Sequence, residues 1–99
     1  MQFILTAYDY PHALEKRLAA RPAHLELVST LHKEGKLIFG GAILDDKGAM
    51  IGSTLICNFP DRQALDQWLK IEPFMLSGVW EKVTILPFKT GPAFAHDLD

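Results

Sequence analysis

The sequence lacks the features that mark secreted, membrane-spanning and nucleic-acid-binding proteins. Its single cysteine, Cys57, cannot form a disulfide within the chain, which favours a reducing, cytoplasmic environment. The net charge is −2 and no basic cluster occurs, so we expect no nucleic-acid partner. No apolar run approaches the ~20 residues of a membrane-spanning helix, and residues 1–9 lack the cationic start of a signal peptide. We therefore expect no membrane partner.

Motifs for cofactors and metals are also missing. The glycine pairs at Gly40 and Gly52 do not have the GxGxxG spacing of a dinucleotide fold, and there is no phosphate-binding lysine loop. The four histidines never stand four residues apart, and Cys57 has no CxxC partner. The sequence therefore predicts neither a cofactor nor a metal.

The 99 residues predict one domain with a single core, since 48% are hydrophobic and 22% are charged. Residues 3–8 alternate in hydrophobicity, as a strand does. Residues 36–43 and 51–59 predict two further strands, joined as a hairpin by the turn residues 45–48. Residues 79–88 predict the last strand, and residues 90–99 a loosely held tail.

Proline and glycine divide the helical part of the sequence. A helical stretch over residues 11–21 is expected to break at Pro22, because proline is poorly tolerated inside a helix. A second helix is predicted over residues 22–34, with Gly35 as its C-terminal cap. The last helix begins after Asp61, whose side chain is a good N-cap.

The resulting order of elements is strand, helix, strand, strand, helix, strand. This order predicts an α+β, ferredoxin-like fold, with a four-stranded antiparallel sheet and both helices on one face. The second face of the sheet is left uncovered, so we expect a homodimer packed sheet against sheet. The apolar residues expected on this face are Ile4, Tyr8, Ile56, Trp80 and Leu86.

His24 is the most informative polar residue, because it shares the apolar stripe of its helix with Leu27, Val28 and Leu31. A titratable ring on such a stripe is either a satisfied core group or the working group of a pocket. Gly41 and Ser53 lie on the two hairpin strands, where glycine allows a ligand to approach the backbone and Ser53 could donate to an anion. Arg17, in contrast, is expected on the outer surface of its helix.

Several stretches together resemble the YciI-like (YCII-related) family, although none is specific alone. The resemblance runs from Phe3 to Phe88 and implies a dimeric ferredoxin-like α+β barrel. The matching stretches are residues 14–18, 21–25, 31–37, 52–54, 72–74, 78–81 and 86–89.

The resemblance also implies a site that pairs a helical histidine with an acid preceding a proline. His24 matches the histidine, Arg21 matches an arginine one helical turn earlier, and Glu72 stands where the family has aspartate. A carboxylate bound to one ring nitrogen would leave the other nitrogen free to take a proton from a substrate. Arg21 could hold an anionic oxygen, or it could pair with Glu15 or Glu26 instead.

Three functions remain open at the level of sequence. The first is a small enzyme without cofactor or metal, in which His24 and Glu72 transfer protons on a small cyclic or carbonyl compound. Some relatives act on such metabolites as a dehydrochlorinase or in roles like that of muconolactone isomerase. The second is a module that binds a small molecule without turnover, and the third is a structural dimer.

Overall fold

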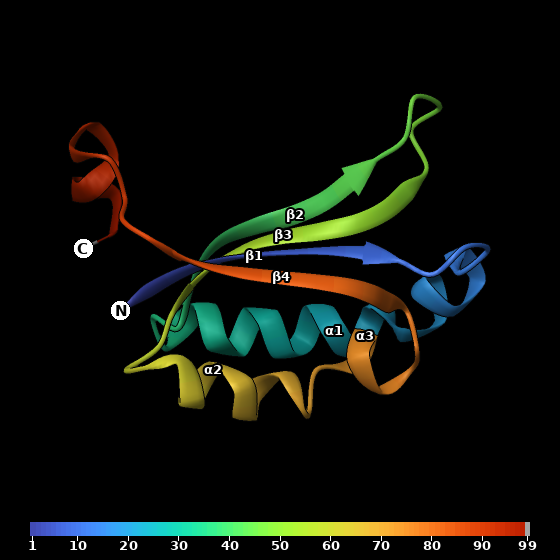
Figure 1. The fold of residues 1–99 in the computed structure, drawn as a ribbon, viewed down its shortest axis with the longest axis horizontal. Helices are drawn as coiled ribbons and strands as arrows, with labels where there is room; N and C mark the ends of the chain where they lie inside the picture. The colour runs from blue at the N-terminus through green and yellow to red at the C-terminus, as the bar shows by residue number, and fades with distance from the viewer. Residues whose placement is uncertain (99) are drawn as a thin grey trace.

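The computed structural model describes residues 1–98, and it describes side chains through Ala95. Four strands form one antiparallel sheet in the order β2-β3-β1-β4, and the helices lie together on one face of it (Figure 1). The fold is therefore α+β and ferredoxin-like, as predicted. The elements are β1 (Gln2–Asp9), α1 (Leu14–Lys33), β2 (Leu37–Leu44), β3 (Met50–Asn58), α2 (Arg62–Leu69), α3 (Pro73–Leu76), β4 (Trp80–Phe88) and a 3₁₀ helix η1 (Pro92–Leu98).

The predicted break at Pro22 is wrong, because α1 continues through this residue. Pro22 has no N–H, so the carbonyl of Leu18, four residues earlier, loses its usual helical donor. The Leu18 side chain is exposed to solvent, so this part of the helix faces outward. The helix is held to the sheet on its other side by buried residues before and after the proline, among them His24 and Leu31. Tertiary packing thus outweighs the local preference.

The remaining element boundaries follow the expected signals. Gly35 has a φ of 76° and ends α1, a backbone conformation that glycine adopts readily. The Asp61 side chain accepts a hydrogen bond from the Ala64 N–H at 2.8 Å and so caps α2. One short helix, α3, was not predicted; Glu72, held extended before Pro73, caps it.

The core lies between the sheet and the helices. Alternate residues of β1 (Phe3, Leu5 and Ala7) are almost fully buried and point toward α1 and α2. Leu31 of α1 and Trp68 of α2 belong to the same buried cluster. This two-layer arrangement packs α1 against the helical face of β2 and β3, where the site described below is found.

Trp80 does not lie on the open face, where its position in β4 predicted it. The register between β1 and β4 shifts after the Tyr8–Lys82 pair, so that Asp9 faces Trp80 and Glu81 is the extra residue of a bulge. One extra residue reverses the side of every side chain beyond it. Trp80 is therefore turned to the helical face, where it is only 3% exposed.

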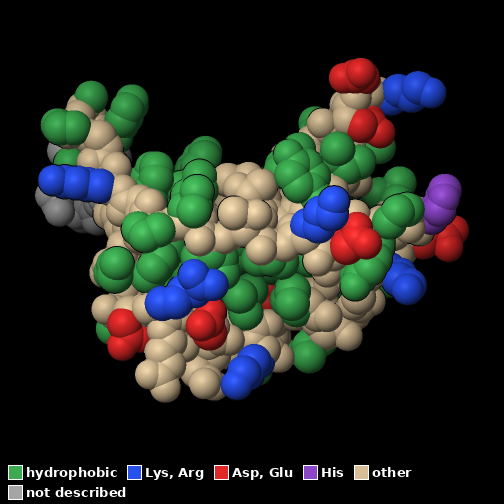
Figure 2. All heavy atoms as spheres, in the orientation of Figure 1, with side chains coloured by type: hydrophobic (Ala, Val, Ile, Leu, Met, Phe, Trp, Pro, Cys, Tyr) green, Lys and Arg blue, Asp and Glu red, His purple; other side chains and the backbone are tan. Residues whose placement is uncertain are grey.

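The opposite face of the sheet carries an apolar row. On β1, Ile4 lies between Ile56 of β3 and Leu86 of β4. Beyond Ile56, Phe39 of β2 continues the row. Phe39 is 75% exposed. Figure 2 shows hydrophobic side chains gathered along this upper face, between the hairpin tip and the C-terminal segment. In the described part of the chain, no helix is long and apolar enough to cross a membrane.

The segment after β4, expected to be a loose tail, is anchored at its start. The backbone N–H and the hydroxyl of Thr90 both donate to the Gln2 side-chain oxygen, at 3.0 and 2.7 Å. The 3₁₀ helix η1 follows and sits above one end of the sheet (Figure 1). The anchor was not evident from composition because its partner lies at the other end of the chain.

Cys57 is predicted to be unreactive while the protein is folded. Burial raises the pKa of its thiol from 9.0 to about 12, and the thiolate is the reactive form. Iodoacetamide at mildly alkaline pH should therefore label Cys57 far more slowly in the native protein than in urea, as measured by mass spectrometry. Equal labelling rates would contradict the buried position.

The same pKa sets the sign of a stability change. Because the folded pKa is raised, ionisation of the unfolded thiol above pH 9.0 draws the equilibrium toward unfolding until about pH 12. Wild type should lose unfolding free energy in this window relative to a Cys57→Ala variant.

Candidate active site

A buried hydrogen-bonded pair connects α1 to the residue before α3. His24 is 7% exposed and Glu72 is fully buried, and the His24 Nδ1 lies 2.6 Å from the Glu72 Oε1. The same carboxylate oxygen accepts the backbone N–H of Phe74 at 2.9 Å. Because Oε1 already accepts from Phe74, we assign the His24 Nδ1–H as the donor in the hydrogen bond to Glu72. The contact expected between these two residues is present.

Two aromatic rings hold the His24 imidazole in place. Phe74 stacks on it, with ring centroids 4.0 Å apart and an angle of 15° between the planes. Trp80 presents its edge at 6.0 Å and 79°. With Nδ1 bound to Glu72, the ring orientation is fixed, and Nε2 is the nitrogen left for another partner.

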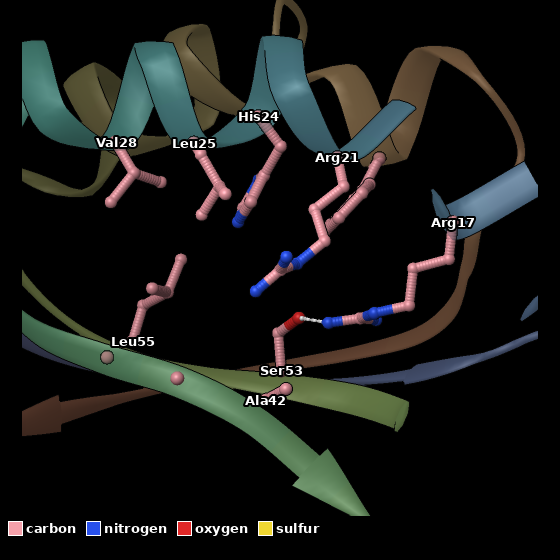
Figure 3. A pocket seen from close by; sticks show the side chains of 11 residues that line it. Arg17, Arg21, His24, Leu25, Val28, Ala42, Ser53 and Leu55 are labelled. Carbon is pink, nitrogen blue, oxygen red and sulfur yellow. Dashed lines mark hydrogen bonds between the residues drawn. The ribbon is translucent and has the colours of Figure 1, made fainter. Parts of the chain in front are cut away.

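A small cavity of about 100 Å³ lies beside His24, between α1 and the hairpin strands β2 and β3. In Figure 3, His24 and Arg21 point from α1 toward the centre of this cavity, and Ser53 points toward it from β3. The helical side is lined by Arg17, Arg21, His24, Leu25 and Val28, the strand side by Gly40, Gly41, Ala42, Ser53 and Leu55, and one end by Phe74. The lining contains two arginines and no acid.

The prediction that Arg17 lies on the outer surface of its helix is wrong. Arg17 is only 2% exposed and lies at the edge of the cavity. Its Nη1 donates to both carboxylate oxygens of Asp9 at 2.9 Å, and its Nη2 donates to the Ser53 Oγ at 2.8 Å. The guanidinium also lies over the Phe74 ring, 4.6 Å from its centroid. Burial raises the pKa of Asp9, while the Arg17 hydrogen bonds and charge act in the opposite direction.

One sequence signal could have found Arg17. It stands seven residues before His24, which places both side chains on the same face of a helix two turns apart. The proline between them concealed this relation, because it predicted two separate helices. Asp9, the partner of Arg17, comes from a different element, so the ion pair itself has no local signal.

Ser53 is held in one hydrogen-bonding role. Its Oγ accepts from Arg17 and, at 3.3 Å, from the Trp80 indole N–H. A hydroxyl has two acceptor sites and one donor hydrogen, so both acceptor sites are taken. The hydrogen is left to donate, and none of the hydrogen bonds found in residues 1–98 uses it. Ser53 can therefore offer a donor to an oxygen in the cavity.

Arg21 and Gly41 line the cavity in different ways. Arg21 is exposed, and its side chain makes no ion pair with any side chain of residues 1–95; the alternative pairings with Glu15 and Glu26 are not formed. Gly41 contributes only its backbone to the lining. A Cβ added to Gly41 would meet no other atom, so glycine is not required here by a close contact. The close approach is at Gly40 instead, where a Cβ would lie 2.3 Å from the Leu55 side chain.

The site contains a buried polar group without a partner. The second carboxylate oxygen of Glu72, Oε2, forms no hydrogen bond with any of the described residues. Buried carboxylates that are only half satisfied lower stability, and such groups are concentrated at functional sites. No group of three or more His, Cys, Asp or Glu side chains within the described chain is arranged to hold a metal ion.

Known proteins resemble this chain over most of its length. Residues 1–89 match the YCII-related domain. Protein YciI of Escherichia coli O6:H1 is 39% identical over 95 residues, covering 90% of this chain and 97% of that protein. An uncharacterized protein of Haemophilus influenzae is 36% identical over 95 residues, covering 90% of this chain and 97% of that protein.

A solved structure shares both the fold and its proportions. It is a 5-chloro-2-hydroxyhydroquinone dehydrochlorinase from Burkholderia phenoliruptrix, in complex with 2,5-dihydroxybenzoquinone. It superposes with a TM-score of 0.83 at 26% identity, covering 94% of this chain and 98% of that one. The domain match over residues 1–89, the related proteins and the common architecture agree, and the chain belongs to the YCII-related domain family.

Proposed function

We propose that the protein is a cofactor-independent enzyme that transfers protons on a small cyclic compound carrying hydroxyl or carbonyl groups. One observation carries the proposal: the His24 ring is fixed by Glu72 on one nitrogen and borders a cavity rich in hydrogen-bond donors. The related dehydrochlorinase, which binds a hydroxylated quinone, supports this class of substrate.

His24 acts as the general base in this mechanism. Its Nε2 removes a proton from a ring carbon or hydroxyl of the substrate, and Glu72 stabilises the imidazolium that forms. The electron pair moves onto a substrate oxygen, where Arg21 and the Ser53 hydroxyl provide donors for the negative charge. Return of the proton to another carbon gives isomerisation. Departure of chloride with its bonding electrons gives elimination.

Arg17 is a positioning residue in this mechanism. Its charge is balanced by Asp9, and its hydrogen bond holds Ser53 with the hydroxyl free to donate. Arg21, which has no such partner among the side chains of residues 1–95, is the arginine available to an anionic substrate. The two arginines on neighbouring turns of α1 therefore have different tasks. Arg17, neutralised by Asp9, positions Ser53, and Arg21 binds the substrate.

Replacing His24 with Asn tests the base directly. The Asn amide can still donate to Glu72 but offers no basic nitrogen, so the rate should fall by about 10²–10⁴-fold. Two rates are measured: chloride release from 5-chloro-2-hydroxyhydroquinone, and deuterium uptake by the ring of 2,5-dihydroxybenzoquinone, followed by NMR.

His12→Asn is the matched control, because His12 lies outside the cavity and its φ of 61° suits asparagine. Its rates should equal those of wild type. If wild type binds the quinone but accelerates neither reaction, the chain is a binding module and the catalytic proposal is wrong.

Replacing Glu72 with Gln tests the role of the carboxylate. The variant keeps the shape of the side chain and removes its charge, so the rate should fall by about 10- to 100-fold, as expected for loss of a charge-assisted hydrogen bond. Nitrogen-15 NMR of the His24 ring should show a smaller share of the tautomer protonated on Nδ1. An unchanged rate together with an unchanged tautomer would contradict the pairing.

We also propose that the open face of the sheet forms a homodimer. The apolar row from Phe39 to Leu86 crosses all four strands; its end residues Phe39 and Leu86 are exposed in the single chain, and the residues between them are half-buried. Burying such a row is the usual reason for sheet-to-sheet association. Light scattering at micromolar concentration should give twice the chain mass of 11.1 kDa, and Leu86→Lys should shift it toward a single mass. A wild-type monomer would refute the dimer.

A further inference from the structure

Phe74 touches a member of each of the two buried polar pairs in the site. The His24 imidazole stacks on its ring, with centroids 4.0 Å apart and planes inclined by 15°, and the Arg17 guanidinium carbon lies 4.6 Å from the same centroid. Phe74 is 1% exposed and His24 7%, so little water reaches this stack. The imidazole, on which a positive charge can form, therefore lies against an aromatic face in a site almost closed to solvent.

An aromatic face attracts a cation, because its π electrons give the face a partial negative charge. The attraction extends to about 6 Å from the ring centroid and is strongest where water is excluded. A neutral imidazole stacks on Phe74 mainly through dispersion. Once His24 takes up a proton, a full positive charge lies 4.0 Å from the Phe74 centroid. The ring therefore binds the imidazolium more strongly than the neutral imidazole.

The charged groups around His24 come from three places in the described chain. Glu72, before α3, accepts the Nδ1 hydrogen bond and favours a positive charge on the ring. Arg21, from α1, lines the same cavity and opposes such a charge. Arg17, also from α1, is neutralised by Asp9 of β1, and the residues of β2 and β3 that line the cavity carry no charge. The aromatic face therefore adds to the effect of Glu72 against that of Arg21.

We propose that Phe74 is a positioning residue that also acts through charge: its ring face stabilises the imidazolium form of His24 while this base holds the substrate proton. The inference rests on the proposed function and adds to it a second group, besides Glu72, that strengthens His24 as a base. Phe74 forms no bond and takes up no proton itself. It lowers the free energy of the protonated intermediate relative to the free base.

Fluorination of one ring tests the inference, because it withdraws electrons from the ring face and nearly keeps the ring shape. Phe74 is replaced by 4-fluoro-, 3,5-difluoro- and pentafluorophenylalanine through site-specific incorporation. NMR of the His24 ring protons, recorded without substrate, gives the midpoint of its protonation. This midpoint should fall with each step of the series, by about one pH unit in total.

The rate provides a second readout of the same series. Deuterium uptake by 2,5-dihydroxybenzoquinone is measured on the upper plateau of the pH profile, where the base is free. The rate should fall in parallel with the midpoint, by up to about tenfold. The affinity for the quinone, measured by calorimetry, should change by less than about twofold, since the effect of Phe74 is exerted through His24.

Phe59→pentafluorophenylalanine is the matched control. Phe59 is also buried and packs on an aromatic ring, with its centroid 5.8 Å from that of Trp68, but it does not line the cavity. Its fluorination should leave the midpoint and the rate unchanged. A midpoint that stays constant along the Phe74 series, or that shifts equally in the Phe59 variant, would show that Phe74 acts by packing alone and would overturn the inference.

The outcomes separate the two proposals, because the midpoint is measured without substrate. A midpoint that falls along the series, in a protein that turns over neither the quinone nor the chlorinated hydroquinone, overturns the proposed function alone. A constant midpoint in a protein that exchanges the quinone protons overturns this inference alone.

Discussion

One carboxylate oxygen holds the site together. The Glu72 Oε1 accepts from the ring of His24 and from the backbone of Phe74, so it joins the middle of α1 to the first turn of α3. Phe74 in turn stacks on His24, which makes the contact reciprocal. A polar pair this buried contributes little net stability against its desolvation, but removing one partner leaves a buried group unsatisfied. Its value lies in the orientation that it imposes on the imidazole.

A second buried pair supports the other end of the cavity. The charges of Arg17 and Asp9 neutralise each other. Arg17, held by Asp9, also donates a hydrogen bond that fixes the Ser53 hydroxyl. Trp80 completes the arrangement by donating to the same hydroxyl. Both pairs join α1 to other elements, so the position of this one helix over the sheet sets the geometry of every polar group in the site. A fixed shell of this kind is what proton transfer requires of a base.

The backbone sets the reach of Glu72, which stands where the family resemblance implies aspartate. Glu72 is extended ahead of Pro73, and from there its longer side chain reaches both the ring of His24 and the N–H of Phe74. The proline therefore acts twice, since it begins α3 and keeps Glu72 out of the helix. The second oxygen, Oε2, lies inside the protein without a partner among the described residues.

The pattern of apolar residues, glycines and caps was sufficient to predict the order of strands and helices along the chain and the ferredoxin-like class, because these depend on local periodicity and turn chemistry. The same is true of His24, whose place on the apolar stripe follows from helical spacing alone. Glu72 was identified through family resemblance, since no local rule relates residues 24 and 72.

Three features were decided only by tertiary structure: the unbroken helix at Pro22, the burial of Arg17 and the face of the sheet on which Trp80 lies. Packing against the sheet offsets the missing hydrogen bond of Pro22, Asp9 from another element neutralises Arg17, and a one-residue bulge against β1 turns Trp80 inward. Each depends on a partner distant in sequence, which local patterns do not report.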